Sequence, residues 1–466
     1  MRQRRMSMIW LGTGLAVTMI AACGGSGGGE PAPASTSEAS PLRWSQLLAA
    51  EGVQSGWHVA VDGTGHIVVV GTMEGTVDFG GEKVTAATEG DLFVARYDAA
   101  GKLVWVRQFG QSGGYQAPFG LAVSQEGDIA LSGALEGAID FGGGALTSAG
   151  DADAFLVLLG PDGAHRFSKQ VGDATMQSGG NVALDEGGNV LWTGTFEGTI
   201  NLGGNALASA GESDIFVAKL DPTGAVVFAQ RMGGAGIDSD GSIAVDSEGN
   251  VVASGYYQGT PDLGGGPLPD TQQKEGQFIV KLDASGQHVY SRGAVSQDGH
   301  FSYTLQADAD GGVLLAGRLN GVVDLGGKTI EAPGGRGFGV ARIDRSGAVV
   351  FAQAYGSTVP GHTCAAPAPG GGMLVAGTFE EDVDLGGEKL KSAGGEDIFV
   401  ARVDATGRIE RHTQIGGPGS ERVWSVAVTA DGAMVLTGGF DGSLDLGAGP
   451  QASAGDEDAF VAVVQP

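Results

Sequence analysis

The chain has 466 residues, 54 of them acidic and 26 basic, and its formal net charge at pH 7 is −28. This charge excludes a nucleic-acid binder that depends on a basic face, and two cysteines exclude a disulfide-stabilised scaffold. The hydrophobic fraction of 42% is enough for a packed core, and the 87 glycines follow no Gly-X-Y period, which excludes collagen. The composition therefore predicts an acidic, glycine-rich globular protein.

The first 23 residues have the features of a bacterial export signal. Three arginines stand among the first five residues, and a mostly apolar stretch follows at 6–22. This stretch is shorter than the about 20 residues of a spanning helix, so we predict a signal peptide at 1–22. Ile20-Ala21-Ala22-Cys23 resembles a lipobox, whose cysteine thiol accepts a diacylglyceryl group. We therefore expect Cys23 to be lipidated; an ordinary secretory signal with an incidental cysteine is the alternative.

A tether follows the predicted lipidation site. Residues 24–40 are small, proline or polar apart from two glutamates, a composition typical of flexible linkers. Glycine rather than aspartate follows Cys23, which by resemblance to the sorting rule of enteric bacteria favours the outer membrane. The predicted organisation is a signal peptide at 1–22, a lipidated cysteine with its tether at 23–40, and a globular part at 41–466. The sequence leaves open which side of the outer membrane this part faces.

The globular part is built from seven copies of one unit. The segment VDFGG at 77–81 recurs in similar form at 139–143, 200–204, 261–265, 323–327, 383–387 and 444–448. Two further markers keep the same spacing of 60 to 62 residues. The first is a phenylalanine: Phe93, Phe155, Phe216, Phe278, Phe338, Phe399 and Phe460. The second is a glycine: Gly71, Gly133, Gly194, Gly255, Gly317, Gly377 and Gly438. Three markers in register indicate one repeat array rather than several unrelated domains.

Each unit reads as four strands, here named A to D. In the first unit they are expected at 57–61, 67–72, 92–97 and 103–109. Tight Asp/Gly turns separate A from B and C from D, and a long connection at 74–90 joins B to C. Strand B is almost entirely apolar, as expected of a strand buried on both faces. No segment shows the 3.6-residue period of a helix.

Four strands repeated seven times predict an all-β fold, a seven-bladed β-propeller with four-stranded blades. The seventh unit ends after its strand C, and residues 42–48 near the N-terminus align with the D strands, with Trp44 at the place of Trp105. We therefore expect the N-terminal strand to complete the last blade and close the ring, which removes two exposed sheet edges.

The runs DIFVAKLDPTGAVVFAQRMGG (214–234) and GNVVASG (249–255) resemble the bacterial seven-bladed beta-propeller (SBBP) repeat. The resemblance covers most of 41–466, although the VDFGG-type segment makes this unit longer than that of the family. It implies a propeller fold. It also implies a lipoprotein or secreted surface protein, because members of the family are largely of these kinds, and their activity is unassigned.

Calcium is the only cofactor for which the sequence offers a motif. The six aspartates and one asparagine of the VDFGG-type segments could bind cations, or could satisfy local amides in a turn: Asp78, Asp140, Asn201, Asp262, Asp324, Asp384 and Asp445. GGAGIDSD at 233–240 matches the start of a calcium-binding nonapeptide but is not repeated in tandem, and DADGG at 308–312 lacks the distal glutamate of an EF-hand. We predict no dedicated cofactor, with weak or structural Ca²⁺ as the alternative.

No catalytic constellation is apparent. The seven histidines form no HExxH, and neither a Gly-x-Ser-x-Gly elbow nor a P-loop occurs. His362 and Cys364 lie two residues apart, but a zinc site needs three or four ligands. Cys364 aligns with a small or polar strand-A residue in most other units, so we interpret it as a packing residue. The sequence thus predicts a protein that is not an enzyme.

A binding face is expected where the long B–C connections and D–A linkers meet, because long loops on a rigid scaffold carry function. Aromatic and polar residues that differ between units gather near the start of strand A. The candidate residues are Trp57, His58, Phe119, Asn181, Asp240, His300, Tyr303, His362, Arg422 and Trp424. Exposed aromatic rings among polar groups suit a protein or carbohydrate ligand.

Three functions remain open at this level. The first is a lipid-anchored, monomeric propeller that binds a protein or carbohydrate partner as a scaffold or adhesion module. The second is a lyase or glycoside hydrolase in the central pocket, with Asp240 and His300 as the best acid–base pair. The third is a calcium-stiffened structural surface module.

Overall fold

The computed structural model describes residues 42–88, 90–110, 114–272, 274–294, 300–446 and 449–465. Only the backbone is described at His300, Val359 and Pro360. The described residues belong to one compact unit, Ser35–Pro466. The predicted signal peptide at 1–22, Cys23 and the tether at 23–40 lie outside the described residues. Across the described ranges the chain is all-β, and no helix in them is long and apolar enough to cross a membrane.

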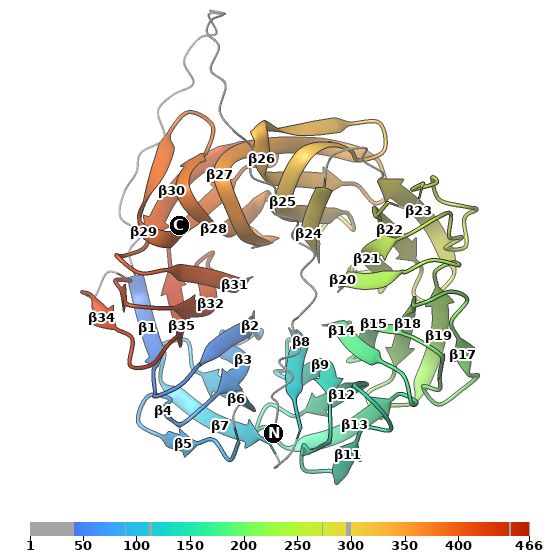
Figure 1. The fold of residues 1–466 in the computed structure, drawn as a ribbon, viewed down its shortest axis with the longest axis horizontal. Coiled ribbons are helices and arrows are strands. Elements are labelled where there is room, and N and C mark those ends of the chain that lie inside the picture. Colours follow the sequence, from blue (N-terminus) through green and yellow to red (C-terminus); the bar gives the residue numbers. More distant parts are fainter. Residues whose placement is uncertain are drawn as a thin grey trace, which may run out of the picture. The chain divides into compact units, whose positions relative to one another are not determined.

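The strands form antiparallel sheets that follow the repeats (Figure 1). The sheet of the first repeat holds β2 (Ser55–Val61), β3 (Ile67–Met73), β6 (Asp91–Tyr97) and β7 (Leu103–Phe109). The second holds β8 (Gln116–Val123), β9 (Ile129–Leu135), β12 (Asp153–Leu159) and β13 (His165–Val171). The third holds β14 (Gln177–Leu184), β15 (Val190–Phe196), β18 (Asp214–Leu220) and β19 (Val226–Met232). The fourth holds β20 (Ser239–Val245), β21 (Val251–Tyr257), β22 (Gly276–Leu282) and β23 (His288–Ala294).

The fifth and sixth repeats share one seven-stranded sheet, because β27 serves as strand D of one and strand A of the next. Its strands are β24 (His300–Ala307), β25 (Val313–Asp324), β26 (Thr329–Ile343), β27 (Val349–Pro367), β28 (Met373–Asp384), β29 (Lys389–Val403) and β30 (Ile409–Ile415). The predicted connections between strands B and C also contain strands, which the sequence analysis missed. They are the hairpins β4 (Thr76–Asp78) and β5 (Lys83–Thr85), β10 (Ala138–Asp140) and β11 (Ala145–Thr147), β16 (Thr199–Ile200) and β17 (Leu207–Ala208), and β33 (Ser443–Leu444) and β34 (Gln451–Ala452).

The last sheet combines strands from both ends of the described chain. It holds β31 (Glu421–Val428), β32 (Met434–Phe440), β35 (Asp458–Val464) and β1 (Leu42–Leu48) in the order β1-β35-β32-β31. β1 pairs antiparallel with β35 from Leu42↔Val464 to Leu48↔Ala459. Leu48 is fully buried there. The N-terminal segment therefore supplies the fourth strand of the seventh repeat.

The A strands lie nearest the middle of the view in Figure 1. They are β2, β8, β14, β20, β24, the C-terminal half of β27, and β31. Each contacts the A strand of the next repeat, and β31 also contacts β2. This arrangement brings residues from distant repeats together at the start of these strands.

The marker glycine and phenylalanine of a repeat form one packing unit. Gly71 on β3 pairs with Phe93 on β6, and a Cβ on Gly71 would lie 2.7 Å from the Phe93 ring. Glycine is therefore needed so that the ring can lie across strand B. All seven marker phenylalanines are at most 1% exposed: Phe93, Phe155, Phe216, Phe278, Phe338, Phe399 and Phe460.

The fifth repeat departs from this pattern. Its Gly317 pairs with Gly339, while Phe338 pairs with Arg318. A Cβ on Gly339 would lie 2.9 Å from the ring of Phe301, which projects from β24. Phe301 thus occupies the space that the marker ring fills elsewhere, and the alignment of Phe338 with the other marker residues is wrong by one position.

Buried ion pairs link the A–B turn to strand C. Asp185 lies 2.9 Å from the Lys219 ammonium, and both side chains are only 8% exposed. The corresponding pairs in the first, fourth and fifth repeats are Asp62–Arg96, Asp246–Lys281 and Asp308–Arg342. In the second and seventh repeats both partners are replaced together, giving Ser124 with Leu158 and Thr429 with Val463. The sixth repeat has Ala368 in the turn, and Arg402 instead contacts Glu410. In six of the seven repeats, therefore, the acid and the cation occur together or are absent together.

A second buried contact crosses from one repeat to the next. The first residue of strand C, a buried aspartate in five repeats, approaches the start of the following strand A. The Ala50 amide, for example, donates to both Gln54 and Asp458, at 3.1 Å each. Between the sixth and seventh repeats the residue at the place of Gln54 is Glu421 instead of glutamine, and its carboxyl group lies close to that of Asp397. Two carboxyl groups therefore face each other in the core.

The raised pKa of Glu421 lets the Asp397–Glu421 pair keep one proton up to about neutral pH. Gly417 N–H donates to Oε2 of Glu421, while Ala393 N–H and the Gln414 amide donate to Oδ2 of Asp397. Among the described residues no donor reaches the remaining oxygens, Oδ1 and Oε1. Burial, with the charges of Asp397 and Asp441, raises the pKa of Glu421 to about 7. The pair is therefore protonated in acid and strained by like charge in base.

We predict that replacing one partner of a buried turn–strand pair is far more harmful than replacing both. Lys219→Leu leaves the Asp185 carboxylate buried without its cation and should cost about 3–5 kcal/mol in urea denaturation. Asp185→Ser/Lys219→Leu reproduces the Ser124–Leu158 combination of the second repeat and should recover most of that loss. A double variant as unstable as the sum of its single variants would contradict this account.

We also predict a pH-dependent stability that depends on Glu421. A carboxyl whose folded pKa is raised makes the unfolding free energy fall as pH rises from its ordinary value near 4.5 to about 7. Glu421→Gln should therefore raise the melting temperature at about pH 8 and leave it little changed at about pH 4.5. Gln177→Glu, which creates the same pair beside Asp153, is the matched control and should lower the melting temperature more at the higher pH. Identical pH profiles for all three proteins would refute the shared proton.

Candidate functional site

Five of the ten candidate residues lie at interruptions of the sheet register. In the pairing of β2 with β3 the register passes from Gly56 to His58, which leaves Trp57 unpaired. Phe119 in β8 and Trp424 in β31 are passed over in the same way. Asn181 in β14 and His362 in β27 fall within wider interruptions at the same place. A β-bulge re-aims side chains and is common beside functional sites, so the structure gives these five residues a shared local geometry.

Each of these bulges stands next to a marker glycine of strand B. Gly71, for instance, is the last pairing partner before the bulge at Trp57. β24 and β25 pair without a shift, so Tyr303 and the backbone of His300 lie in regular register. Asp240 is the last paired residue before a similar interruption in β20. Asp240, Tyr303 and the backbone of His300 thus lie in paired positions, outside the bulges.

Trp57, His362 and Trp424 form an aromatic cluster on three neighbouring A strands. The Trp57 and Trp424 ring centroids are 5.7 Å apart at 32°, and His362 lies 5.8 Å from Trp424 at 51°. Trp57 Nε1–H donates to Thr72 at 3.1 Å. The indole N–H of Trp424 has no hydrogen-bond partner within the part of the chain that the structure describes. All three residues are partly exposed, so the cluster offers aromatic faces, whereas the Trp424 indole nitrogen itself is buried.

The cluster contains one neutral imidazole, that of His362, and a second, that of His58, lies beside it. Loss of solvation lowers the pKa of His58 to about 4; its bond to the Pro118 carbonyl opposes the shift, and the nearby His362 adds to it. Burial likewise lowers the pKa of His362, against a bond to the Trp424 backbone. Both rings are therefore uncharged at neutral pH and cannot provide a cation. The site is suited to stacking and hydrogen bonding rather than to ion pairing.

Asn181, Asp240 and Tyr303 instead form hydrogen bonds between neighbouring repeats. Asn181 donates to the Gly241 carbonyl at 2.7 Å, and Tyr303 donates to the Phe278 carbonyl at 3.3 Å. The Thr195 hydroxyl donates to Asp240 at 2.7 Å. Burial raises the pKa of Asp240 to about 6, although its hydrogen bond from Thr195 acts in the opposite direction. The structure thus places these three residues in seams between sheets.

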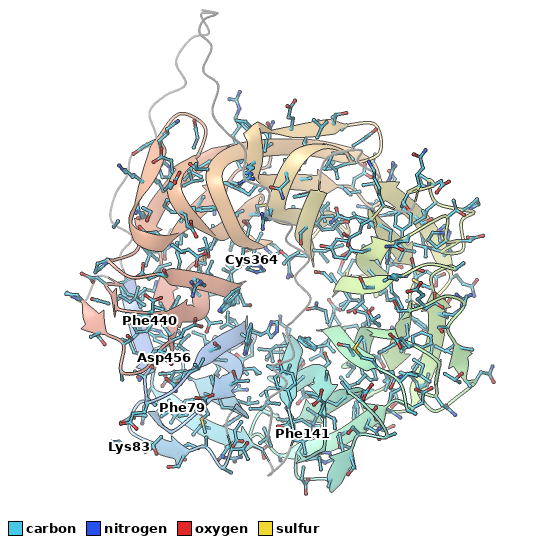
Figure 2. The ribbon with its side chains drawn as sticks, in the orientation of Figure 1. Phe79, Lys83, Phe141, Cys364, Phe440 and Asp456 are labelled. Atoms are coloured by element: carbon cyan, nitrogen blue, oxygen red, sulfur yellow. The ribbon has the colours of Figure 1, made fainter. Side chains whose placement is uncertain are left out.

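The remaining predicted residues have simpler surroundings. Arg422 forms ion pairs with Glu396 and, at 3.2 Å, with Glu457. Phe119 is partly exposed on β8. Cys364 is buried near the middle of the view in Figure 2, where burial raises the pKa of its thiol. This is the environment of a packing residue. The side chain of His300 lies outside the described part, so its predicted pairing with Asp240 stays a prediction.

The acids considered as cation ligands are engaged locally. Asp78 accepts the amides of Gly80 and Gly81 at 3.0 and 2.7 Å, and these bonds lower its pKa. The equivalent aspartates and Asn201 cap their own turns in the same manner. Within the described ranges, no three histidine, cysteine, aspartate or glutamate side chains are gathered so as to hold a metal ion. This geometry is that of turn capping.

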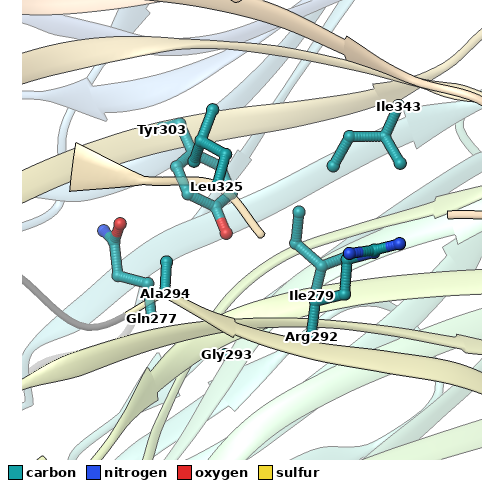
Figure 3. A pocket seen from close by; sticks show the side chains of 8 residues that line it. All are labelled: Gln277, Ile279, Arg292, Gly293, Ala294, Tyr303, Leu325 and Ile343. Atoms are coloured by element: carbon teal, nitrogen blue, oxygen red, sulfur yellow. The ribbon is translucent and has the colours of Figure 1, made fainter. Parts of the chain in front are cut away.

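A small hollow lies between the fourth and fifth repeats, beside Tyr303 (Figure 3). Ile279, Leu325 and Ile343 contribute apolar side chains to it, and Arg292 borders it. Among its described lining residues there is no acid, histidine or cysteine. It offers less chemistry than the aromatic cluster.

Sequence reasoning missed one set of exposed residues on the same edge of the sheets. Val53, Tyr115, Met176 and Ile237 lie one or two residues before four successive A strands and are 39–52% exposed. Each stands before a buried Gln or Asp, and an apolar residue at this place in consecutive repeats is a signal that the sequence contained. They share the edge on which the aromatic cluster lies.

Comparisons with known proteins find distant similarity. No family model matches the chain, so the SBBP-type resemblance stays a prediction. A curated relative, an uncharacterized WD repeat-containing protein of Acanthamoeba polyphaga mimivirus, is 25% identical over 158 residues, or 30% of this chain. The match spans only 11% of that relative's length.

Two solved structures illustrate the structural neighbours. A Dyadobacter fermentans protein of unknown function has a TM-score of 0.43 at 12% identity, covering 92% of this chain and 99% of that one. The β-propeller domain of the Trilobed protease from Pyrococcus furiosus has a TM-score of 0.45 at 11% identity, covering 89% and 94%. The chain is an all-β repeat protein, and β-propeller proteins are among the solved structures similar to it.

Proposed function

We propose that the seven repeats form a closed, seven-bladed β-propeller in which β1 completes the last blade. The pairing of β1 with β35 and the contact between β31 and β2 support closure. An ion pair supports it further, because Arg43 on β1 lies 2.7 Å from Asp431 in the A–B turn of the seventh repeat. In the second repeat Arg166 on strand D contacts Asp128 in the corresponding turn. β1 therefore resembles a strand D both in its position in the sheet and in its ion pair with the A–B turn.

We further propose that the protein is a lipid-anchored binding module of the bacterial cell envelope. Cys23 would be the anchor, 24–40 the tether, and the outer membrane the site of attachment. The partner is a protein or a carbohydrate, bound by a monomeric propeller that serves as a scaffold or adhesion module. The observation that carries the binding role is the Trp57–Trp424–His362 cluster at the β-bulges of three A strands.

The chemistry of this cluster favours binding. Tryptophan supplies a large rigid face at little cost in conformational entropy and is enriched among residues that dominate binding energy. Neutral imidazoles at His58 and His362 can donate or accept without repelling a polar ligand. A sugar ring or an apolar protein side chain would satisfy this combination.

A catalytic role has less support. Its best acid, Asp240, accepts hydrogen bonds from Thr195 and from the Asn181 backbone. Such bonds hold the carboxyl within a seam between repeats. We therefore propose a binding role rather than a lyase or hydrolase.

Binding through the cluster can be tested by site-specific photo-crosslinking in the full chain. A benzophenone side chain at position 57 or 424 should give partner adducts in envelopes, whereas one at Val104, which is 50% exposed on β7, should not. A glycan array run with the Trp57→Ala/Trp424→Ala variant should lose any carbohydrate signal of the native chain. Trp57→Phe keeps a ring but lacks the N–H bond to Thr72, and it should retain most of the signal. Equal adducts at all three positions would overturn the assignment.

The lipid anchor makes a separate prediction. Cys23→Ser removes the thiol that accepts the diacylglyceryl group, so the protein should move from the detergent phase to the aqueous phase on Triton X-114 partitioning. The melting temperature of the propeller should not change, because the substitution lies outside 41–466. A Cys23→Ser protein that still partitions with detergent would show that Cys23 is not the anchor.

A further inference from the structure

Exposed large apolar side chains are not scattered evenly over the repeats. Nine are exposed within the described part of the chain, and eight of these occupy two repeat positions. One position is the second residue of strand D: Val104, Val227, Val289 and Val350. The other is the residue before the buried Gln or Asp near the start of strand A: Val53, Tyr115, Met176 and Ile237. We call the second group the linker crescent; it belongs to four consecutive repeats.

The backbone under the linker crescent is fixed by buried neighbours. Gln177, directly after Met176, is 1% exposed; it accepts the Asp173 amide at 2.9 Å and donates to the Glu197 carbonyl. The Met176 carbonyl in turn accepts the Glu197 amide at 3.2 Å. The polar side chain therefore turns inward and holds the apolar one outward. A backbone that is already fixed loses little entropy when a partner covers the side chains that it carries.

An acidic residue accompanies the first three members. Glu74, Glu136 and Glu197 each directly follow a B strand. The Val53 amide donates to the Glu74 carboxylate at 3.2 Å, and the Glu136 amide donates to the Tyr115 carbonyl at 2.7 Å. None of the ion pairs found among the described residues involves these three glutamates. Each of these three repeats therefore places an exposed apolar side chain beside a glutamate that takes part in none of these ion pairs.

We propose that the linker crescent and its three glutamates form a docking surface for a basic, amphipathic protein segment. Apolar side chains of the segment would cover the crescent, and its lysine or arginine side chains would pair with the glutamates. The negative charge repels acidic lipid headgroups and polyanions. This inference rests on the proposed binding role and specifies the chemistry of a protein partner at the same edge.

The test uses short synthetic peptides and the full chain carrying Cys23→Ser, which needs no detergent. Three peptides separate the apolar contribution from the charge contribution. One alternates lysine with leucine, one alternates lysine with serine, and one alternates glutamate with leucine. Fluorescence anisotropy at about 150 mM salt should show clear binding only for the lysine–leucine peptide. Equal binding of the lysine–serine peptide would reduce the effect to nonspecific charge attraction and overturn the proposal.

Matched variants locate the surface. Tyr115→Ser/Met176→Ser/Ile237→Ser should weaken lysine–leucine binding by about tenfold or more. Val104→Ser/Val227→Ser/Val289→Ser removes equally exposed side chains from the outer strands and should change it less than about twofold. Melting curves confirm that each variant is folded. Equal losses in both triple variants would refute the crescent as the docking surface.

Two further variants test the contribution of the negative charges. Glu136→Gln/Glu197→Gln should weaken binding and flatten its salt dependence. Glu126→Gln/Glu186→Gln, two exposed glutamates in A–B turns at the opposite edge of the sheets, should not. The Trp57→Ala/Trp424→Ala variant should bind the peptide normally. Loss of peptide binding in that variant alone would assign the basic segment to the aromatic cluster, which distinguishes failure of this proposal from failure of the proposed function.

Discussion

No repeat of this protein can bury its own core, and the rest of the structure depends on that constraint. A four-stranded sheet has two apolar faces, and each must be covered by the sheet of a neighbouring repeat. The buried clusters accordingly mix repeats: Val68 and Val94 of the first pack with Leu131 and Phe155 of the second. The seams between sheets therefore carry the main packing, and most polar contacts described above either cross a seam or fix the strands beside one.

This arrangement explains why so much of the fold could be predicted from the sequence. Six of the seven repeats pair the same glycine with the same phenylalanine, so the markers recur at nearly constant spacing and indicate the strands directly. The short hairpins such as β4–β5 were missed because two or three residues between turns carry no periodic signal. The place of Phe338 was also misjudged, because the ring that covers Gly339 comes from Phe301 on another strand, a substitution that only three-dimensional contact reveals.

The candidate site was predictable in position but not in detail. The departures from symmetry near the start of strand A did contain Trp57, His362 and Trp424. However, a bulge depends on how two strands align, which a single sequence does not state. Asp240 and Asn181 looked equally suited to a ligand, yet their partners, Thr195 and the Gly241 carbonyl, lie on other strands. The division into an aromatic cluster and contacts between sheets therefore had to come from the structure.

The coupled replacement of turn acids and strand cations has a consequence for how such an array changes over time. A repeat with Ser124 and Leu158 and a repeat with Asp185 and Lys219 are two self-consistent solutions to one structural problem. Intermediates that hold only one half are penalised, so sister repeats drift apart in paired steps. Duplicated units that have diverged in this way carry their own compatibility with them. The two residues can then be exchanged together with less disturbance than either one alone, which makes the coupled pair, not the single residue, the unit of variation at this place in the repeat.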